Sequence, residues 1–473
     1  MDVDEARGYC QPVGIDHLAS RLIRPPDRHN APVSHTNIGH PTRRSGAVYH
    51  HPAPNNTIQH RHTPALSSFS GQLSPTPLPY PRRSTGVSDV CEAYPLRRSI
   101  AVVGAGWTGA VAGRLLTDAG FAVEVMEKTG VVGGHSRAET MNGVVYEPNG
   151  AHIFHTSNAA VNEFVNAHGL TRPYDHKVLT EVYLSPDDDD HEGHLLSWPP
   201  QVSELEELPI WPRVERELAS LPSQPTGDNF EDYVVSMMGR TLYDLFIRDY
   251  TAKQWGRPAT ELSARFAPKR VELRRDGNRG LFRDRWQYFP PSGINEVIES
   301  VLSPVAVTLN TEVTTDDADR LGQDYDAVIV TAALDDFARC PGELEWRGIE
   351  MVSQHHATEE PGGVVTPAYV TNRPSMRVPY TRTVETKHAT GQQIGGTVVS
   401  EEMPGAPRRH YPVLTADGTN ERRNAKLAEK IAGCFDIPVY FAGRLATYRY
   451  INQDEAIADA MEVADRVASD LEE

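Results

Sequence analysis

The stretch that decides the fold reads SIAVVGAGWTGAVAGRLLTDAGFAVEVME and runs from Ser99 to Glu127. Its apolar start predicts a strand, the amphipathic run that follows predicts a helix ending in glycine, and the last apolar run predicts a second strand. Gly104, Gly106 and Gly109 stand where the first strand turns into the helix. Glycines at this spacing allow a tight turn, close approach of a pyrophosphate and close packing of helix on strand. The stretch therefore predicts a βαβ unit that binds a dinucleotide at the positive end of its helix.

An acidic residue and a pair of glycines extend this motif. Glu127 ends the second predicted strand, where its carboxylate can accept hydrogen bonds from a ribose diol. Gly133 and Gly134 follow after a short loop. The extended stretch resembles the FAD-binding signature of the amine-oxidase-like flavoproteins, although an alanine is more usual in place of Gly113. The resemblance implies that the dinucleotide is FAD rather than NAD.

Composition and charge disfavour several classes of partner. The chain of 473 residues carries 46 Lys and Arg against 64 Asp and Glu, a formal charge of −18. This charge disfavours nucleic acid and anionic membrane as partners. The four cysteines lie far apart, so we expect neither a disulfide framework nor a zinc or other metal site, and the cytoplasm fits best. No apolar run reaches the length of about 18 residues that a membrane span needs.

The order of predicted elements indicates an α/β fold. Strands and helices alternate at both ends, and helices and antiparallel strands lie between them. This order predicts a Rossmann-type FAD-binding domain built from discontinuous segments, with an inserted helical domain and an antiparallel β-sheet domain. We assign the FAD-binding domain to 97–175, 276–340 and 411–473, a mainly helical domain with a mobile lid near its end to 176–275, and an antiparallel substrate domain to 341–410. Residues 1–96, rich in Pro, His, Arg, Ser and Thr, predict a disordered or atypical extension.

Four short segments narrow the function further. They read GAHIFHT at 150–156, YTAKQWG at 250–256, PYTR at 379–382 and GRLATYRY at 443–450. With the glycine motif they resemble the bacterial UDP-galactopyranose mutases from about residue 99 to the C-terminus. The resemblance implies an isomerase that interconverts the pyranose and furanose forms of a nucleotide-sugar of the UDP-galactose type. It also implies FAD in its reduced form, an adduct between flavin N5 and the sugar, no net redox change, and a cytoplasmic homodimer.

The resemblance assigns two arginines to the departing diphosphate. Arg382 lies in PYTR, and Arg274 lies in RVELRRD, which is part of a mobile lid in the family. Arginine stays protonated, and its planar fork matches the oxygens of a phosphate. The neighbouring Arg275 remains an alternative to Arg274. His155 is expected beside the flavin and is not expected to transfer a proton.

Two larger groups of side chains are also assigned by the resemblance. Contacts with the nucleotide-sugar are expected from Phe246, Ile247, Tyr250, Trp255, Asn372, Glu402, Tyr411, Tyr450 and Asn452. Contacts with FAD are expected from Gly104, Gly106, Thr108, Gly109, Glu127, Lys128, Gly134, His135, His152, Gly443, Arg444 and Asp454. Some of these positions depart from the family pattern, since His135 replaces an asparagine, Ile247 a phenylalanine and Asn452 an aspartate.

Three alternatives stay open at this point. A GDP-sugar could replace the UDP-sugar, because Ile247 leaves room beside Tyr250, and Arg373 and Arg377 could donate hydrogen bonds to purine acceptors. An FAD-dependent amine-oxidase-like oxidoreductase would use the same cofactor domain without diphosphate arginines. A flavin-bound structural or sensor protein would lack a substrate pocket. For either nucleotide-sugar, the identity of the sugar stays open.

Overall fold

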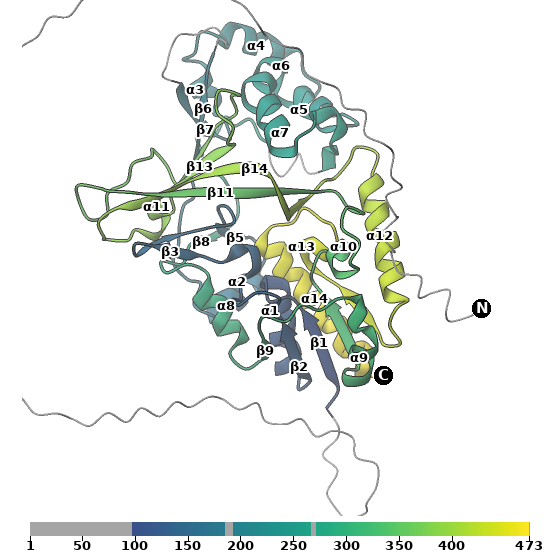
Figure 1. Cartoon of the computed structure of the whole chain (residues 1–473). Helices are drawn as coiled ribbons and strands as arrows, with labels where there is room; N and C mark the ends of the chain where they lie inside the picture. Colours follow the sequence, from purple (N-terminus) through teal and green to yellow (C-terminus); the bar gives the residue numbers. More distant parts are fainter. Residues whose placement is uncertain (1–96, 185–192, 266–270, 473) are drawn as a thin grey trace, which may run out of the picture. The chain divides into compact units, whose positions relative to one another are not determined.

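The computed structural model describes residues 97–184, 193–265 and 271–472 (Figure 1). The expected extension over 1–96 lies outside these residues, and so does the part of the expected lid over 266–270. The structural statements below concern the described residues.

A parallel sheet of five strands lies at the centre of the nucleotide-binding part (Figure 1). Its strands are β1 (Ser99–Val103), β2 (Ala122–Met126), β9 (Ala306–Thr308), β10 (Ala327–Val330) and β15 (Val439–Phe441). They pair in the order β15-β10-β1-β2-β9, and every pair is parallel. Because these strands come from distant parts of the chain, the predicted Rossmann-type domain of discontinuous segments is confirmed.

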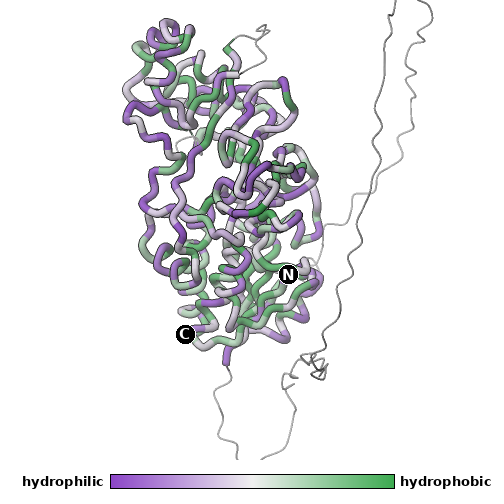
Figure 2. The backbone as a smooth tube through the Cα atoms, turned by 90° about the vertical axis from the view of Figure 1, so that its left-hand side faces the viewer, coloured by the Kyte–Doolittle hydropathy of each residue, from purple (hydrophilic) through white to green (hydrophobic). Residues whose placement is uncertain are grey.

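Both faces of this sheet are covered, because its strands are apolar on both sides. In β1, Ile100 and Val102 belong to one hydrophobic cluster, whereas Ala101 and Val103 belong to another. The first cluster is completed by α1 (Trp107–Asp118), α2 (Ala159–Ala167), α8 (Asn295–Leu302) and α14 (Gln453–Glu472). The second is completed by α9 (Ala318–Asp324), α10 (Leu334–Phe337), α12 (Thr419–Ala432) and α13 (Gly443–Ala446). Figure 2 shows hydrophobic stretches, in green, alternating with hydrophilic ones, in purple, along the whole described tube.

A second sheet has six strands in the order β11-β14-β13-β12-β6-β7. The strands are β6 (Val178–Val182), β7 (His194–Trp198), β11 (Trp346–His356), β12 (Val370–Asn372), β13 (Arg382–Val384) and β14 (Thr397–Pro412). The β12–β6 pair is parallel and the other pairs are antiparallel. The segment 176–275, which we expected to be mainly helical, thus begins with two strands that belong to this sheet.

A helical part follows these two strands in the chain and lies above the sheet in Figure 1. It contains α3 (Val202–Leu205), α4 (Trp211–Ala219), α5 (Phe230–Met238), α6 (Arg240–Tyr243), a π-helical turn (Asp244–Arg248) and α7 (Asp249–Trp255). Its own hydrophobic cluster includes Val234, Leu242 and Phe246. Other elements of the described residues include two small antiparallel pairs, β3 (Glu139–Met141) with β4 (Val144–Tyr146) and β5 (Phe154–Thr156) with β8 (Trp286–Tyr288), and the short helix α11 (Lys387–Thr390). Short 3-10 turns span Gly134–Ser136, Ala259–Glu261 and Thr315–Asp317.

The described residues offer neither a helix suited to crossing a membrane nor a cluster of metal-binding side chains. None of the helices in the described ranges combines the length and apolarity that crossing a membrane requires. Over the same ranges, no group of three or more His, Cys, Asp or Glu side chains is placed so that it could hold a metal ion.

Candidate active site

A cavity of about 570 Å³ lies at the carboxyl ends of β1 and β2. Ligands of open α/β sheets bind at this edge. The lining includes most of the predicted cofactor residues, namely Gly104, Gly106, Thr108, Glu127, Lys128, Gly134, His135, His152, Gly443 and Arg444. Gly109 and Asp454 do not line this cavity. The structure therefore brings ten of the twelve predicted cofactor residues into one place.

The three glycines of the first motif have different surroundings. Gly104 has φ +102°, and a Cβ on it would lie 2.5 Å from Thr331 Oγ1. A Cβ on Gly109 would lie 1.9 Å from the carbonyl oxygen of Gly104, so Gly109 allows the helix to pack on the strand. The nearest atom to a Cβ on Gly106 is 3.9 Å away, on Gly134. Gly106 therefore borders open space in which a pyrophosphate can approach the backbone, and these residues fit a dinucleotide.

Glu127 is held in place by both of its carboxylate oxygens. Its Oε2 accepts a hydrogen bond from the N–H of Ala105 at 2.9 Å. Its Oε1 accepts from the N–H of Thr129 at 2.9 Å and from the Thr129 hydroxyl at 2.8 Å. The carboxylate is thus fixed at the cavity wall, where its further lone pairs can accept from a ribose.

Substituting Gly106 is expected to remove the cofactor and leave the fold intact. In Gly106→Val the side chain enters the open space of the cavity, so the pyrophosphate cannot approach the backbone. In Gly109→Val the side chain meets the backbone of Gly104, so the β1–α1 packing itself should fail. We expect flavin content, measured after heat release, to fall to background in Gly106→Val with circular dichroism unchanged. Full flavin content in that variant would contradict the assignment.

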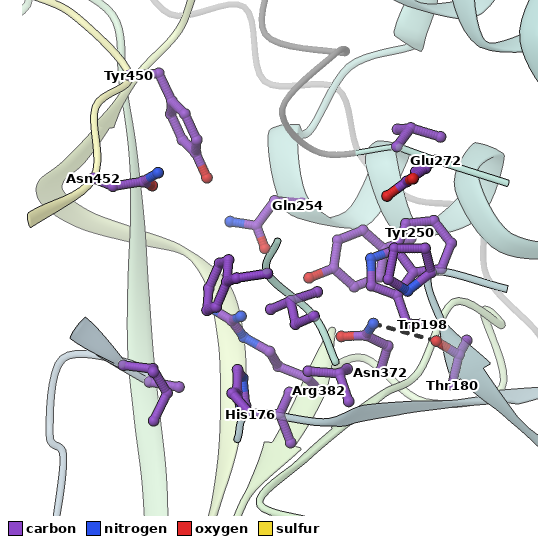
Figure 3. Close-up of a pocket in the computed structure, with 18 of the residues that line it drawn as sticks. His176, Thr180, Trp198, Tyr250, Gln254, Glu272, Asn372, Arg382, Tyr450 and Asn452 are labelled. Carbon is purple, nitrogen blue, oxygen red and sulfur yellow. Dashed lines mark hydrogen bonds between the residues drawn. The ribbon is translucent and has the colours of Figure 1, made fainter. Parts of the chain in front are cut away.

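A second cavity, of about 320 Å³, is bordered by the helical part and the six-stranded sheet (Figure 3). Its lining includes His155, Phe246, Ile247, Tyr250, Trp255, Asn372, Arg382, Tyr411, Tyr450 and Asn452, all of which were predicted from the sequence. His152, Arg444, Asn452 and Gln453 line both cavities. The two cavities are therefore adjacent, so a dinucleotide in the first can present one end to a ligand in the second.

Arg382 supplies a fixed positive charge to the second cavity. Its Nε and Nη2 lie 2.7 and 2.6 Å from Glu402 Oε2. Burial would lower the pKa of Arg382, but the Glu402 carboxylate more than offsets this effect and raises the pKa above its ordinary value. Glu402 is fully buried and also accepts a hydrogen bond from the Thr381 hydroxyl at 3.0 Å. Glu402 does not line the cavity in this structure and positions Arg382, so the substrate contact expected of it stays a prediction.

Arg274 is not brought to either cavity. Its side chain is buried, and Nε lies 2.8 Å from Glu272 Oε2. The other nitrogens donate to the carbonyl oxygens of Asn278, Gly280 and Leu281. The backbone of Arg274 is bonded to the segment that follows β7, since Val202 N–H donates to its carbonyl at 2.8 Å. Arg274 thus ties the segment 272–281 together in this structure, and its expected diphosphate contact would require it to leave these partners.

The two arginines that were expected to recognise a purine are also engaged elsewhere. Arg373 forms an ion pair with Glu181, and the Arg377 guanidinium lies 3.9 Å above the centre of the Tyr183 ring. Neither arginine lines the cavity. In this structure Arg373 and Arg377 therefore do not present their hydrogen-bond donors to the cavity.

Glu272, a residue that we did not predict, places a carboxylate in the lining of the second cavity. Figure 3 shows Glu272 near Tyr250 and Trp198, while Tyr450 and Asn452 lie on the opposite side. Burial would raise the pKa of Glu272, but Arg283 and Arg274 hold it below its ordinary value. The residue is therefore ionised at neutral pH. No sequence pattern pointed to Glu272, because its position depends on how the segment after residue 270 pairs with residues 200–202, which follow β7.

His155 is oriented by a second acidic residue that sequence reasoning missed. Its Nδ1 lies 2.7 Å from Asp284 Oδ2, and its ring stacks on Phe282 with 3.5 Å between ring centres. The hydrogen bond with His155 lowers the pKa of Asp284. Asp284 also accepts a hydrogen bond from the Ser157 hydroxyl at 2.9 Å. These contacts fix the orientation of the His155 imidazole at the cavity wall.

Three other histidines meet at the junction of the two cavities. His135 stacks on His410 with 4.2 Å between ring centres, and His152 lies 6.4 Å from His410. Burial and the positive charge of Arg444 lower the pKa values of His135 and His152 to about 3. These imidazoles are therefore neutral at neutral pH, and Arg444 supplies positive charge beside them.

The comparisons with known proteins agree with this geometry. Residues 245–450 match a family model described as UDP-galactopyranose mutase, and residues 102–167 match an NAD(P)-binding Rossmann-like domain. The chain is 27% identical over 393 residues to a probable UDP-galactopyranose mutase of Klebsiella pneumoniae, covering 79% of this chain and 96% of the relative. It is 26% identical over 385 residues to the dTDP-fucopyranose mutase of Escherichia coli, covering 77% and 97%.

The fold is also similar to those of solved structures. A crystal structure of reduced UDP-galactopyranose mutase superposes with a TM-score of 0.62 at 18% identity, covering 79% of this chain and 96% of that one. A crystal structure of a putative protoporphyrinogen oxidase from Exiguobacterium superposes with a TM-score of 0.56 at 14% identity, covering 79% and 99%. Because both identities are low, these likenesses show the shared fold alone.

Proposed function

Because this chain belongs to the UDP-galactopyranose mutase family, we propose that it interconverts the pyranose and furanose forms of UDP-galactose or a close UDP-hexose. Membership of this family implies a flavoprotein isomerase that acts on a nucleotide-sugar. The observation that carries the finer proposal is the position of Arg382. Its charge is fixed by Glu402 in a cavity that adjoins the dinucleotide cavity.

Each group of cavity residues has a role in this proposal. Bound FAD, in its reduced form, supplies a nucleophile at N5 for the anomeric carbon. Arg382 stabilises the negative charge that develops on the leaving diphosphate. One wall of the cavity is formed by the aromatic rings of Trp255, Tyr411 and Tyr450, whose centres lie 5.5 to 6.1 Å apart. This wall keeps the nucleotide close to the anomeric carbon after the bond between them breaks. Tyr250 and Trp198 offer ring faces to the base.

The same cavity argues against an amine-oxidase-like activity. A protonated amine would meet the Arg382 guanidinium, whose pKa is raised above its ordinary value. Arg444 lines the same cavity and carries a second positive charge. Two like charges disfavour a cationic substrate and favour an anionic one. From the family resemblance we further propose a cytoplasmic homodimer.

A GDP-hexose is a second candidate because of Glu272. Guanine presents two adjacent N–H groups, at N1 and N2, which suit the two oxygens of one carboxylate. Uracil presents one N–H between two carbonyl oxygens, which a carboxylate repels. Ile247 also takes less room beside Tyr250 than an aromatic side chain would. The relatives named for UDP-galactopyranose and dTDP-fucopyranose further indicate that base and sugar differ among similar chains.

A substrate panel tests the proposal and separates the candidates. Reduced protein is given UDP-galactose, dTDP-fucose and GDP-hexoses side by side, and products are resolved by chromatography. We expect the highest kcat/KM with UDP-galactose, little changed by Glu272→Gln. A higher kcat/KM with a GDP-hexose that Glu272→Gln lowers by about tenfold or more would establish the second candidate, since a glutamine amide has one acceptor oxygen for the two guanine N–H donors and turns its own N–H group toward the other. Failure to isomerise any of these compounds would contradict the mutase proposal.

A further inference from the structure

The ammonium group of Lys253 lies within a ring of backbone carbonyl groups. The side chain is buried, with 9% of the residue exposed. Its Nζ donates to the carbonyl oxygens of Arg373 at 2.5 Å, Ser375 at 2.8 Å, Val378 at 3.2 Å and Tyr380 at 2.8 Å. An ammonium has three protons, so these acceptors occupy all of its donor capacity. Lys253 therefore acts here as a fixed cation inside the protein and not as a solvent-exposed charge.

The two sides of this contact belong to different parts of the active site. Lys253 lies in α7, whose side chains at Tyr250 and Trp255 line the second cavity. The four carbonyl groups belong to 373–381, the connection between β12 and β13. Asn372 ends β12 and Arg382 begins β13, and the two residues are paired across the hairpin. Lys253 thus joins the helix that carries the aromatic residues to the hairpin that carries the diphosphate arginine.

Other contacts hold each side of this junction without using the Lys253 side chain. On the helix side, Arg347 donates to the carbonyl oxygens of Gln254 at 2.7 Å and Lys253 at 2.9 Å. On the hairpin side, Glu402 fixes the guanidinium of Arg382. Loss of the Lys253 ammonium would therefore leave both sides folded and Arg382 charged. The spacing between them would no longer be fixed.

We propose that Lys253 is a positioning residue that sets the distance between the two aromatic residues of α7, Tyr250 and Trp255, and Arg382. The proposal rests on the function proposed above, because it requires a nucleoside diphosphate to contact both sides at once. A ligand that contacts two preorganised sides loses affinity when their spacing must be fixed during binding. The effect should fall on nucleotide affinity and KM more than on kcat, since Arg382 keeps its own support.

Lys387 offers a matched control. It is also a buried lysine, with 2% of the residue exposed, and its Nζ donates to the carbonyl oxygens of Ile394 at 2.7 Å and Gly396 at 2.6 Å. It lies in α11 and lines neither cavity. Lys387→Met removes a buried ammonium from carbonyl partners, as Lys253→Met does, but away from the site. A general loss of stability would therefore show in both variants.

The test compares Lys253→Met, Lys387→Met and the unsubstituted holoenzyme. The dissociation constant of UDP is measured by calorimetry, KM and kcat are measured with UDP-galactose, and the melting temperature is recorded. We expect Lys253→Met to raise the dissociation constant and KM by about tenfold or more, while kcat falls by less than about threefold. Lys387→Met should lower the melting temperature and leave both binding values unchanged.

Several results would overturn this inference. Unchanged UDP affinity in Lys253→Met, or an equal loss in Lys387→Met, would make Lys253 a stability residue only. If Lys253→Met does not fold, Lys253→Arg takes its place, because a planar guanidinium cannot direct its donors to carbonyl groups around one atom; wild-type affinity in that variant would count against the inference. Failure of the unsubstituted protein to bind UDP at all would overturn the function proposed above, and this inference with it.

Discussion

Replacing Arg382 with alanine is expected to lower kcat by about 100-fold or more. The guanidinium is a fixed positive charge in the second cavity, with Nη2 and Nε at 2.6 and 2.7 Å from Glu402 Oε2. Removing one preorganised donor from a developing negative charge typically costs about 3 kcal/mol of transition-state stabilisation. Arg382→Lys should recover little of the loss, because an ammonium cannot bond Glu402 and a diphosphate through one planar fork. Initial rates with UDP-galactose and reduced protein measure the effect.

A double variant separates this catalytic loss from a structural one. Arg382→Ala leaves the buried Glu402 carboxylate without its ionic partner, which by itself destabilises the protein. Combining Arg382→Ala with Glu402→Gln removes that unpaired charge. We expect the double variant to regain melting temperature but not turnover. Recovery of turnover in the double variant would show that Arg382 acts through folding and not on the leaving group.

Turnover is expected to require reduction of the bound FAD and to be absent in the oxidised protein. Oxidised flavin is electrophilic at N5, so it cannot supply the nucleophile that the reaction needs. Positive charge from Arg444 at the junction of the cavities favours the reduced, anionic form of the cofactor. Rates with UDP-galactose are compared under argon with and without dithionite. Equal rates in the two states would refute the role given to the cofactor.

The cofactor half of the molecule could be predicted closely because its signals are local. The turn at Gly104 requires a positive φ, and Gly109 is set by a helix packing on the adjacent strand. Helix α2 begins directly after Asn158, a typical N-cap residue, whose side chain accepts from the N–H groups of Ala160 and Val161. These features depend on residues near one another in the chain, which a single sequence exposes.

The substrate half was predicted less fully because its contacts join distant segments. Tyr250, Trp255 and Arg382 were identified from the family resemblance and do line the cavity. Glu402 was assigned to the substrate but lies behind Arg382, because β13 and β14 are paired and place its carboxylate there. Arg274 is engaged by three backbone carbonyl groups and Glu272, a pattern that depends on the path of 272–281. Side-chain direction in such loops is not encoded by spacing alone.

Strand lengths also depend on contacts between distant segments, so the sequence alone predicts them poorly. The runs VAVTLNTEV at 305–313 and GGVVTPAYVTN at 362–372 both favour extended backbone along most of their length, but the structure has only β9 (Ala306–Thr308) and β12 (Val370–Asn372) in these segments. Apolar β-branched runs favour extended backbone, whereas pairing depends on a neighbouring strand being present. The long pair of β11 and β14 shows the opposite case, since eleven and sixteen residues extend where partners are available.

The mass of the product and the redox state of the flavin show directly whether the protein isomerises its substrate without net oxidation. Dithionite-reduced protein is incubated with UDP-galactose under argon, and the product is analysed by chromatography and mass spectrometry while the flavin spectrum is followed. A mutase gives many turnovers per flavin, a product with the mass of the substrate and a five-membered sugar ring, and a flavin that is still reduced at the end. A product differing by two hydrogens, or oxidation of one flavin for each product formed, would contradict the proposed mutase activity.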